Sequence, residues 1–118
     1  MAKLSNNQLT LTGKSKDQYI FTDIYALESD FPDVSGIYVF TKRKRTESGG
    51  FNHHAIYIGQ ADSFKNRFSS HHKEKDILKE GANAVCLMAV GKQGQRDLIE
   101  VDLIKNYNPC CNDHHVVK

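Results

Sequence analysis

The sequence lacks any apolar stretch long enough to cross a membrane, and it has no apolar leader at its start. The longest uninterrupted apolar run, Ala84 to Val90, is far shorter than the ~20 residues that a membrane-spanning helix needs. The opening residues, Met-Ala-Lys-Leu-Ser-Asn-Asn, lack the apolar core of a secretory signal. We therefore expect a cytoplasmic protein that does not bind a membrane.

Cysteine is scarce too: the chain has three cysteines, an odd number that cannot all pair in disulfides within the chain. Because two of them are adjacent, at positions 110 and 111, a disulfide framework is a poor interpretation, which agrees with a reducing compartment. A zinc site is an alternative, and its ligands would be Cys110, Cys111, Asp113, His114 and His115. The spacing argues against zinc, because adjacent side chains do not easily turn to one ion and no Cys-x-x-Cys pair is present.

Charge of one sign is not in large excess, since sixteen Lys and Arg oppose fourteen Asp and Glu for a net charge of +2. The charges are unevenly placed: residues 17–33 carry five acids and no base, whereas residues 41–79 carry nine basic and four acidic groups. The middle segment is therefore where a polyanion would bind. The length of 118 residues and the hydrophobic content of 39% are those of one ordinary globular domain.

Hydrophobic patterning predicts a mixed α/β domain of the α+β type. Residues 36–41 and 55–60 are apolar on both faces and rich in β-branched and aromatic side chains, as the central strands of a covered sheet are. The other expected elements are a β-hairpin over residues 8–22, a covering segment with a helical turn over 23–33, a helix that begins at Asp62 or Ser63, a short helix over 73–80, a strand over 84–90 and a helix over 95–107.

A basic segment separates the two central strands. The connection over residues 39–56 is 18 residues long and contains four consecutive basic residues, followed by Gly49-Gly50. We expect a long, mobile, basic hairpin loop that binds DNA, with a merely solvated strand connection as the alternative. The candidate nucleic-acid-binding residues are Lys42, Arg43, Lys44, Arg45 and Lys65.

The last predicted helix places a carboxylate on its apolar face. At about 100° per residue, Ile99, Leu103, Ile104 and Tyr107 share one arc, and Glu100 projects from the middle of it. An ionised carboxylate buried without a partner is costly, so this residue must be protonated, paired with a cation or coordinated to a metal. A structural ion pair with an arginine and a metal site both satisfy that requirement.

Five features in one order resemble the GIY-YIG nuclease domain. They are Gly36-Ile37-Tyr38, Tyr57-Ile58-Gly59, Arg67, Glu100 and Asn112. The resemblance implies a three-stranded antiparallel central sheet flanked by helices, to which the expected hairpin adds an N-terminal extension. On this basis residues 1–33 form the extension, residues 34–113 the nuclease-like domain and residues 114–118 a tail.

The resemblance also implies an activity, the hydrolysis of DNA phosphodiester bonds with a divalent metal. Glu100 would be the metal ligand for Mg²⁺, with Mn²⁺ able to replace it, because Mg²⁺ prefers oxygen donors and few protein carboxylates. Arg67 matches the catalytic arginine, whose planar guanidinium can donate two hydrogen bonds to phosphate oxygens.

The family's remaining roles fall on two tyrosines, a histidine and an asparagine. Tyr57 and His71 are rival general bases, and a phenol with its ordinary pKa of about 10 needs help to serve. Tyr38 would orient the water or Tyr57, and Asn112 would close the site. The alternatives are a noncatalytic nucleic-acid-binding module on the same scaffold and a nuclease subunit directed by a partner. The sequence leaves self-association, the DNA structure preferred and the biological pathway open.

Overall fold

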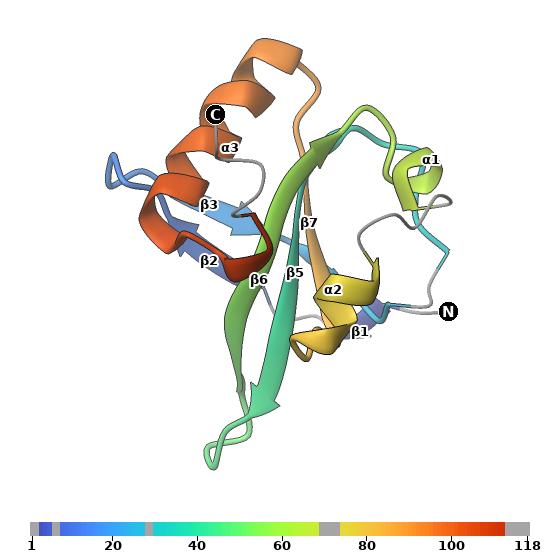
Figure 1. Ribbon diagram of the computed structural model, residues 1–118, viewed down its shortest axis with the longest axis vertical. Helices are drawn as coiled ribbons and strands as arrows, with labels where there is room; N and C mark the ends of the chain where they lie inside the picture. The colour runs from blue at the N-terminus through green and yellow to red at the C-terminus, as the bar shows by residue number, and fades with distance from the viewer. Residues whose placement is uncertain (1–2, 6–7, 28–29, 69–73, 113–118) are drawn as a thin grey trace.

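A five-stranded antiparallel sheet forms the centre of the computed structural model, which describes residues 3–5, 8–27, 30–68 and 74–112 (Figure 1). Its strand order is β1-β4-β7-β5-β6, and β2 and β3 pair separately as a hairpin. The elements are β1 (Lys3–Ser5), β2 (Leu9–Thr12), β3 (Gln18–Phe21), β4 (Asp23–Tyr25), β5 (Gly36–Arg45), β6 (Phe51–Ala61), α1 (Phe64–Phe68), α2 (Glu74–Lys79), β7 (Ala84–Ala89), α3 (Gln93–Tyr107) and the 3-10 helix η1 (Cys110–Asn112).

The α+β fold expected from the sequence is confirmed, and its sheet is wider than three strands. The central strands β7, β5 and β6 are joined by β4 and β1 at one side. Residues 23–25 were expected in a covering segment, and that expectation is wrong, because Ile24 pairs with Cys86 of β7 and is almost fully buried. The described part of the segment 23–33 holds no helix. None of the described helices combines the length and apolar character that a membrane crossing requires.

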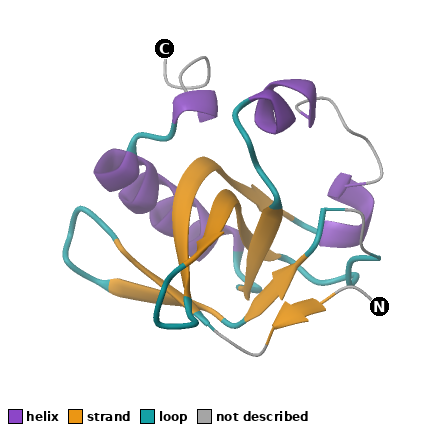
Figure 2. Ribbon diagram, turned by 90° about the horizontal axis from the view of Figure 1, so that it is seen from below, coloured by secondary structure: helices purple, strands orange, loops and turns teal. Residues whose placement is uncertain are grey.

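Each face of the sheet is covered by a different set of elements (Figure 2). On one face, Tyr38 and Ile56 pack with Phe64 of α1 and Ile77 of α2. On the other face, Ile37, Val39 and Ile58 pack with Leu103 of α3 and with residues of the β2–β3 hairpin. Because β5 contributes alternate side chains to both layers, it is buried on both sides, as the apolar segment 36–41 predicts.

The expected N-terminal hairpin is present and is anchored to α3 by one carboxylate. Asp102 accepts hydrogen bonds from the backbone N–H of Ser15 at 2.8 Å, from its hydroxyl at 2.7 Å and from the Tyr19 hydroxyl at 2.8 Å. The hydrogen bonds from Ser15 are the main reason that the pKa of Asp102 is lowered. The hairpin thereby fixes α3, the helix that carries Glu100, against the sheet.

The segment between the two central strands is a two-stranded ribbon whose ladder shifts register between Phe40 and Thr41, so the expectation of a long loop is wrong. The β5–β6 ladder continues through Lys42 opposite His54 to Arg45 opposite Phe51. Only residues 46–50 form the turn, in which Gly49 has a φ of +94°, a conformation that favours glycine. The ribbon projects away from the helices at the bottom of Figure 1.

Candidate active site

Two stacked tyrosines on neighbouring strands form the centre of the site. The rings of Tyr38 on β5 and Tyr57 on β6 lie 6.0 Å apart, with 29° between their planes. Gly59 lies opposite Tyr38 in the ladder, and a Cβ atom there would come within 2.5 Å of the Tyr38 hydroxyl oxygen. Gly36 is equally constrained, because its Cβ atom would collide with the carbonyl oxygen of Met88 on β7. Gly59 therefore creates the space into which Tyr38 packs, whereas Gly36 allows the backbone of β7 to come close to β5.

Helix α1 brings a guanidinium to the two phenols. Its first turn is capped by the Ser63 hydroxyl, which accepts a hydrogen bond from the backbone N–H of Asn66 at 3.2 Å. One turn further, the Cζ atom of Arg67 lies 5.7 Å from the centre of the Tyr38 ring. The positive charge of Arg67 acts on the hydroxyls of both Tyr38 and Tyr57, and the two hydroxyls also influence each other. The three side chains form one polar cluster at the border of the aromatic core.

The environment keeps both phenols protonated near neutral pH. Burial raises the pKa of Tyr38 and of Tyr57 above the ordinary value, and the positive charge of Arg67 opposes that rise in each. The negative charge of Glu100 raises the pKa of Tyr57 further, so that carboxylate lies within electrostatic reach of this phenol. Unless a cation is added beside it, Tyr57 cannot serve as a base near pH 7.

Glu100 extends from α3 toward the edge strand β6. Its Oε1 atom accepts a hydrogen bond of 2.8 Å from the side-chain amide of Gln60. Burial raises the pKa of Glu100, the amide lowers it, and the charge of Asp97 raises it again. Among the residues that the structure describes, no arginine forms an ion pair with Glu100. The nearby Arg96 pairs with Asp62, at 2.7 Å.

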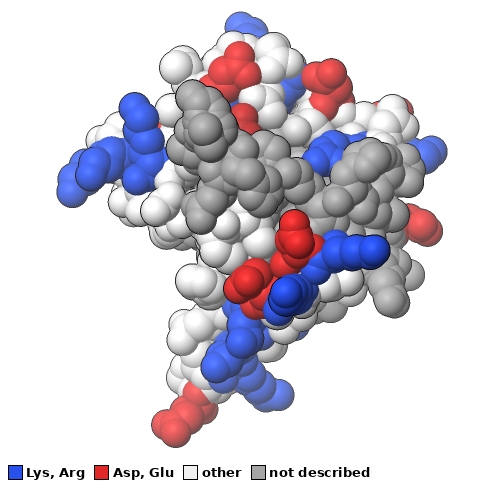
Figure 3. Space-filling view, viewed as in Figure 1, with Lys and Arg blue, Asp and Glu red and all other residues white. Residues whose placement is uncertain are grey.

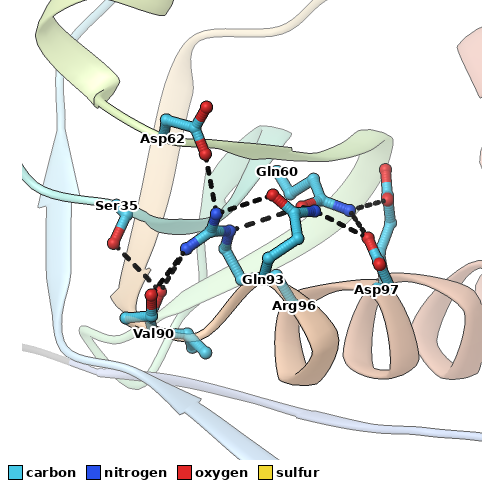
Figure 4. Close-up of polar contacts among 9 residues, drawn as sticks. Ser35, Gln60, Asp62, Val90, Gln93, Arg96 and Asp97 are labelled. Carbon is cyan, nitrogen blue, oxygen red and sulfur yellow. Dashed lines mark hydrogen bonds and ion pairs between the residues drawn. The ribbon is translucent and has the colours of Figure 1, made fainter.

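The position of Gln60 is set by Arg96, a residue that sequence analysis did not single out. Arg96 is only 4% exposed, and its guanidinium donates to the carbonyl oxygens of Val90 at 3.0 Å and Gly91 at 3.1 Å (Figure 4). Its Nε atom donates to the side-chain oxygen of Gln60 at 3.3 Å. The spacing of Arg96 and Glu100, four residues apart on one helix face, was the available signal.

The side chain of Asn112 binds the backbone of strand β6. Its side chain is 2% exposed and bridges both polar groups of Ile58, accepting from the N–H at 2.9 Å and donating to the carbonyl at 2.9 Å. Since β6 is the last strand of the sheet, the amide takes the place of a neighbouring strand at an otherwise open edge. Asn112 thus fixes the segment between Tyr57 and Gly59.

The structure brings together four of the six candidate catalytic residues, and it places a fifth beside them. Tyr38, Tyr57 and Arg67 are in contact, Glu100 is within electrostatic reach, and Asn112 holds the strand. The sixth, His71, lies outside the described residues. Among the candidate nucleic-acid-binding residues, Lys42, Lys44, Arg45 and Lys65 are exposed and Arg43 is half-buried.

The proposed zinc ligands are only partly described. Residues 113–115 lie outside the described residues, and the sulfur atoms of Cys110 and Cys111 are 3.7 Å apart, with both thiols free. In the described ranges, no group of three or more His, Cys, Asp or Glu side chains is arranged to hold a metal ion. A single carboxylate, that of Glu100, is the acidic ligand that the site offers beside the tyrosines.

This donor set fits a hard divalent cation. Carboxylate and phenol oxygens are hard donors, and Mg²⁺ commonly takes only one or two protein carboxylates because water and phosphate complete its shell. Gln60 fixes one oxygen of Glu100, burial raises the pKa of that carboxyl, and among the described residues no cationic side chain forms an ion pair with it. A cation at this position would supply the counter-charge.

Comparison with known proteins agrees with this geometry, although no family model matches the chain. The UvrABC system protein C of Hydrogenobaculum is 31% identical over 96 residues, which are 76% of this chain and 15% of that protein. The same protein of Fervidobacterium nodosum is 29% identical over 85 residues, which are 69% of this chain and 14% of that protein. The chain therefore spans about a seventh of the length of these curated relatives.

One solved structure is similar to this chain over most of the length of the solved domain. The GIY-YIG N-terminal endonuclease domain of UvrC from Thermotoga maritima, bound to magnesium as its catalytic divalent cation, has a TM-score of 0.53 and 29% identity. The match covers 70% of this chain and 86% of that domain. Point mutants of the same domain, also bound to the catalytic cation, match comparably.

The fold and the tyrosine–arginine–glutamate cluster define a small GIY-YIG domain of the endonuclease class, which is a class of hydrolases. The chain belongs to the GIY-YIG nuclease family, as the five sequence features indicated. Within that family, its likeness is to the N-terminal domain of UvrC.

Proposed function

We propose that this chain hydrolyses DNA phosphodiester bonds with a divalent cation, Mg²⁺ or Mn²⁺, bound at Glu100. The observation that carries the proposal is the convergence of a guanidinium, two phenols and a carboxylate without a full counter-charge at one edge of the sheet. The magnesium-bound UvrC domain, which is similar over most of its length, supports the choice of cation.

Each side chain has a physical task in this reaction. Arg67 donates hydrogen bonds to phosphate oxygens as negative charge develops on them, a role that suits a planar guanidinium. Tyr38 holds Tyr57 and Arg67 in position through its hydroxyl. When bound, the cation would polarise the phosphate and lower the pKa of a coordinated water. Glu100 would bind the cation, with its orientation set by Gln60.

The general base is either Tyr57 or His71. The raised pKa of Tyr57 makes it a poor base alone, whereas the positive charge of a cation near Glu100 would lower that pKa. His71 is the alternative because imidazole, as a side-chain type, exchanges protons near neutral pH. Cleavage rates of Tyr57→Phe and His71→Ala from pH 5 to 9 separate them, because loss of the true base removes the limb that reports its deprotonation.

Target choice by a partner is a second part of the proposal. The curated relatives are components of a named system, UvrABC, and this chain corresponds to a small part of their length. We therefore propose a repair-type nuclease whose target is selected outside the domain described here.

The experiment is a plasmid-nicking assay. Wild-type chain with Mg²⁺ or Mn²⁺ is expected to convert supercoiled plasmid to nicked circles, and a chelator or the Glu100→Gln substitution is expected to abolish the conversion. Glu100→Gln keeps the size and the hydrogen-bond acceptor for Gln60, so it isolates the charge. Equal conversion by the wild type and this variant contradicts the proposal.

A further inference from the structure

We propose that the β5–β6 ribbon is a docking arm for duplex DNA, which binds phosphates about four to six base pairs from the cleaved bond through Lys42 and Lys44. This inference rests on the proposed function for the position of the cleaved bond. The face, the spacing and the charge of the ribbon are argued from the structure. Of the four basic residues at 42–45, Lys42 and Lys44 thereby bind DNA, and Arg43 stiffens the ribbon.

The two lysines lie on the same side of β5 as the catalytic tyrosine. Side chains alternate along a strand, so Tyr38, Lys42 and Lys44 all point to one face. Lys42 and Lys44 line one shallow hollow of about 310 Å³ with Asn52, His53 and His54 of β6. The ribbon therefore presents the charges of these two lysines on the face of β5 to which Tyr38 belongs.

Strand geometry fixes how far these charges lie from the site. At about 3.3 Å per residue, Lys42 is ~13 Å and Lys44 is ~20 Å along β5 from Tyr38. Duplex DNA rises about 3.4 Å for each base pair, so these distances correspond to about four and six base pairs. A duplex whose cleaved phosphate lies beside Arg67 and which follows the strand direction would place later phosphates at the lysines.

Arg43 has a different task, because it lies on the opposite face of the ribbon. Its guanidinium carbon is 3.8 Å from the centre of the Phe51 ring, a stacked cation–π contact across the two strands. Its backbone N–H donates to the Asn83 side chain at 2.7 Å, and its carbonyl accepts from the same side chain at 3.0 Å. These contacts hold the base of the ribbon rigid, so Arg43 is a stiffening residue and not a phosphate ligand.

Charge and shape together favour a duplex. Lysine and arginine side chains gather along the ribbon in the lower part of Figure 3, and Glu47 in the turn is the acidic residue within the fully described range 42–54. A two-stranded ribbon fits the DNA major groove, which is about 12 Å wide. The major groove of an RNA duplex is too narrow for side chains to enter.

Single-stranded nucleic acid is the less suitable occupant. Proteins that bind single strands offer aromatic rings on which bases stack. Among the Phe, Tyr and Trp residues, residues 42–54 of the ribbon hold Phe51, whose ring face is covered by Arg43. His54 is a smaller ring in the hollow beside the two lysines. The ribbon therefore offers regularly spaced charge without a free Phe, Tyr or Trp ring on which bases could stack.

The test measures binding in the cleavage-deficient Glu100→Gln chain, with calcium in place of magnesium. Substitution of Lys42 and Lys44 together by Ser is expected to make the slope of log affinity for a 30-base-pair DNA against log salt shallower by about two, since about 0.9 counterion is released for each phosphate contact. Substitution of the exposed Lys14 and Lys105 by Ser removes the same charge elsewhere and should leave the slope unchanged. Equal slopes in the two double variants, or tighter binding to the single strand or to duplex RNA than to duplex DNA, would overturn the inference.

A second arm locates the contacts. The position of cleavage is mapped with the wild type on an end-labelled duplex, and single phosphates at increasing distance are replaced by neutral methylphosphonates. Weakened binding is expected at about four to six base pairs on one side, and this effect should vanish in the double variant Lys42→Ser, Lys44→Ser. An even effect at all distances overturns the spacing. If the wild type cuts nothing, the proposed function fails, while the salt slopes still decide whether the ribbon binds duplex DNA.

Discussion

The side-chain amide of Gln60 donates a hydrogen bond of 2.8 Å to the carboxylate of Glu100. The oxygen of the same amide accepts from the Nε atom of Arg96 at 3.3 Å and from the side chain of Gln93 at 2.8 Å. Because two donors face that oxygen, the amide cannot rotate by half a turn without losing both of them and opposing two oxygens. The buried guanidinium therefore determines which way Glu100 is presented.

Replacement of Gln60 by Leu tests that relationship. Loss of the amide removes the hydrogen bond that lowers the pKa of Glu100 and orients its oxygen. We expect Mg²⁺ affinity to fall about 10- to 100-fold, as is usual when a partner of a metal ligand is removed. The measurement is the increase in Tm as Mg²⁺ is added. The matched control is Gln95→Leu at an exposed site of α3, the helix that carries Glu100, and an equal loss in both variants would contradict the assignment.

The pH dependence of stability tests the burial of Glu100. Because burial raises its pKa, the folded chain binds this proton more tightly than the unfolded chain does. The stabilising contribution is full below about pH 4.3 and is lost as the pH rises through the raised pKa. Glu100→Gln cannot ionise, so we expect its Tm without metal to exceed that of the wild type at pH 7 and the two to converge near pH 4. A difference that is constant with pH would show that the carboxyl is not perturbed.

Replacement of Gly59 by Ala tests the close packing of Tyr38. The added Cβ atom would lie 2.5 Å from the phenol oxygen, so the ring must move within a packed core. We expect a loss of about 1–3 kcal/mol in the free energy of unfolding. Gly94→Ala is the matched control, because nothing lies within 4 Å of a Cβ atom there and alanine favours the helix. Denaturant unfolding measures both variants, and equal stabilities would contradict the packing argument.

Asn112 offers a third test of stability. In Asn112→Ala, the buried N–H and carbonyl of Ile58 lose their partners, and each unsatisfied group costs about 1–3 kcal/mol. Cys110→Ala changes an exposed side chain of the same short helix and should be close to neutral. Amide hydrogen exchange at Ile58 gives a local measure, and we expect its protection to fall in the first variant alone. Unchanged protection there would show that the bridge is unimportant.

Arg67 is expected to act mainly on the rate of cleavage. Arg67→Ala should lower plasmid nicking about 10²- to 10³-fold, the usual effect of losing a donor to developing charge. Arg67→Lys retains the charge without the planar pair of donors, so it should recover only part of that rate. Binding to a 30-base-pair duplex is the control, and it should change less than threefold. If affinity falls as much as rate, the guanidinium is a docking contact.

The elements that carry the tyrosines and Glu100 were predictable from local sequence. Residues 36–41 and 55–60 are apolar on both faces, which only a covered strand requires, and the 3.6-residue period over 95–107 placed Glu100 beside the core. The site was predictable to the same extent, because its residue types occur in a recognisable order along these elements. The roles at Tyr57 and Asn112 needed the structure, since burial and backbone contacts decide them.

Features that depend on distant partners were not predictable. The strand Asp23–Tyr25 is three residues long, and it forms because β7, some sixty residues later, offers it a ladder. Lys42 to Arg45 are weak strand formers, and pairing with β6 and the Asn83 side chain makes them regular. The burial of Arg96 likewise depends on acceptors contributed by Asp62 and Val90.

The acid comes from α3, near the C-terminal end of the described chain, whereas both phenols and the guanidinium precede residue 68. Protein synthesis therefore delivers the cation ligand last. A nascent or truncated chain that ends before α3 contains the phosphate-binding half of the centre without the half that would recruit metal, and it also lacks the amide that closes the sheet edge. Under the proposed function, such a chain cannot cut DNA, and that ability arises only when α3 packs against the sheet.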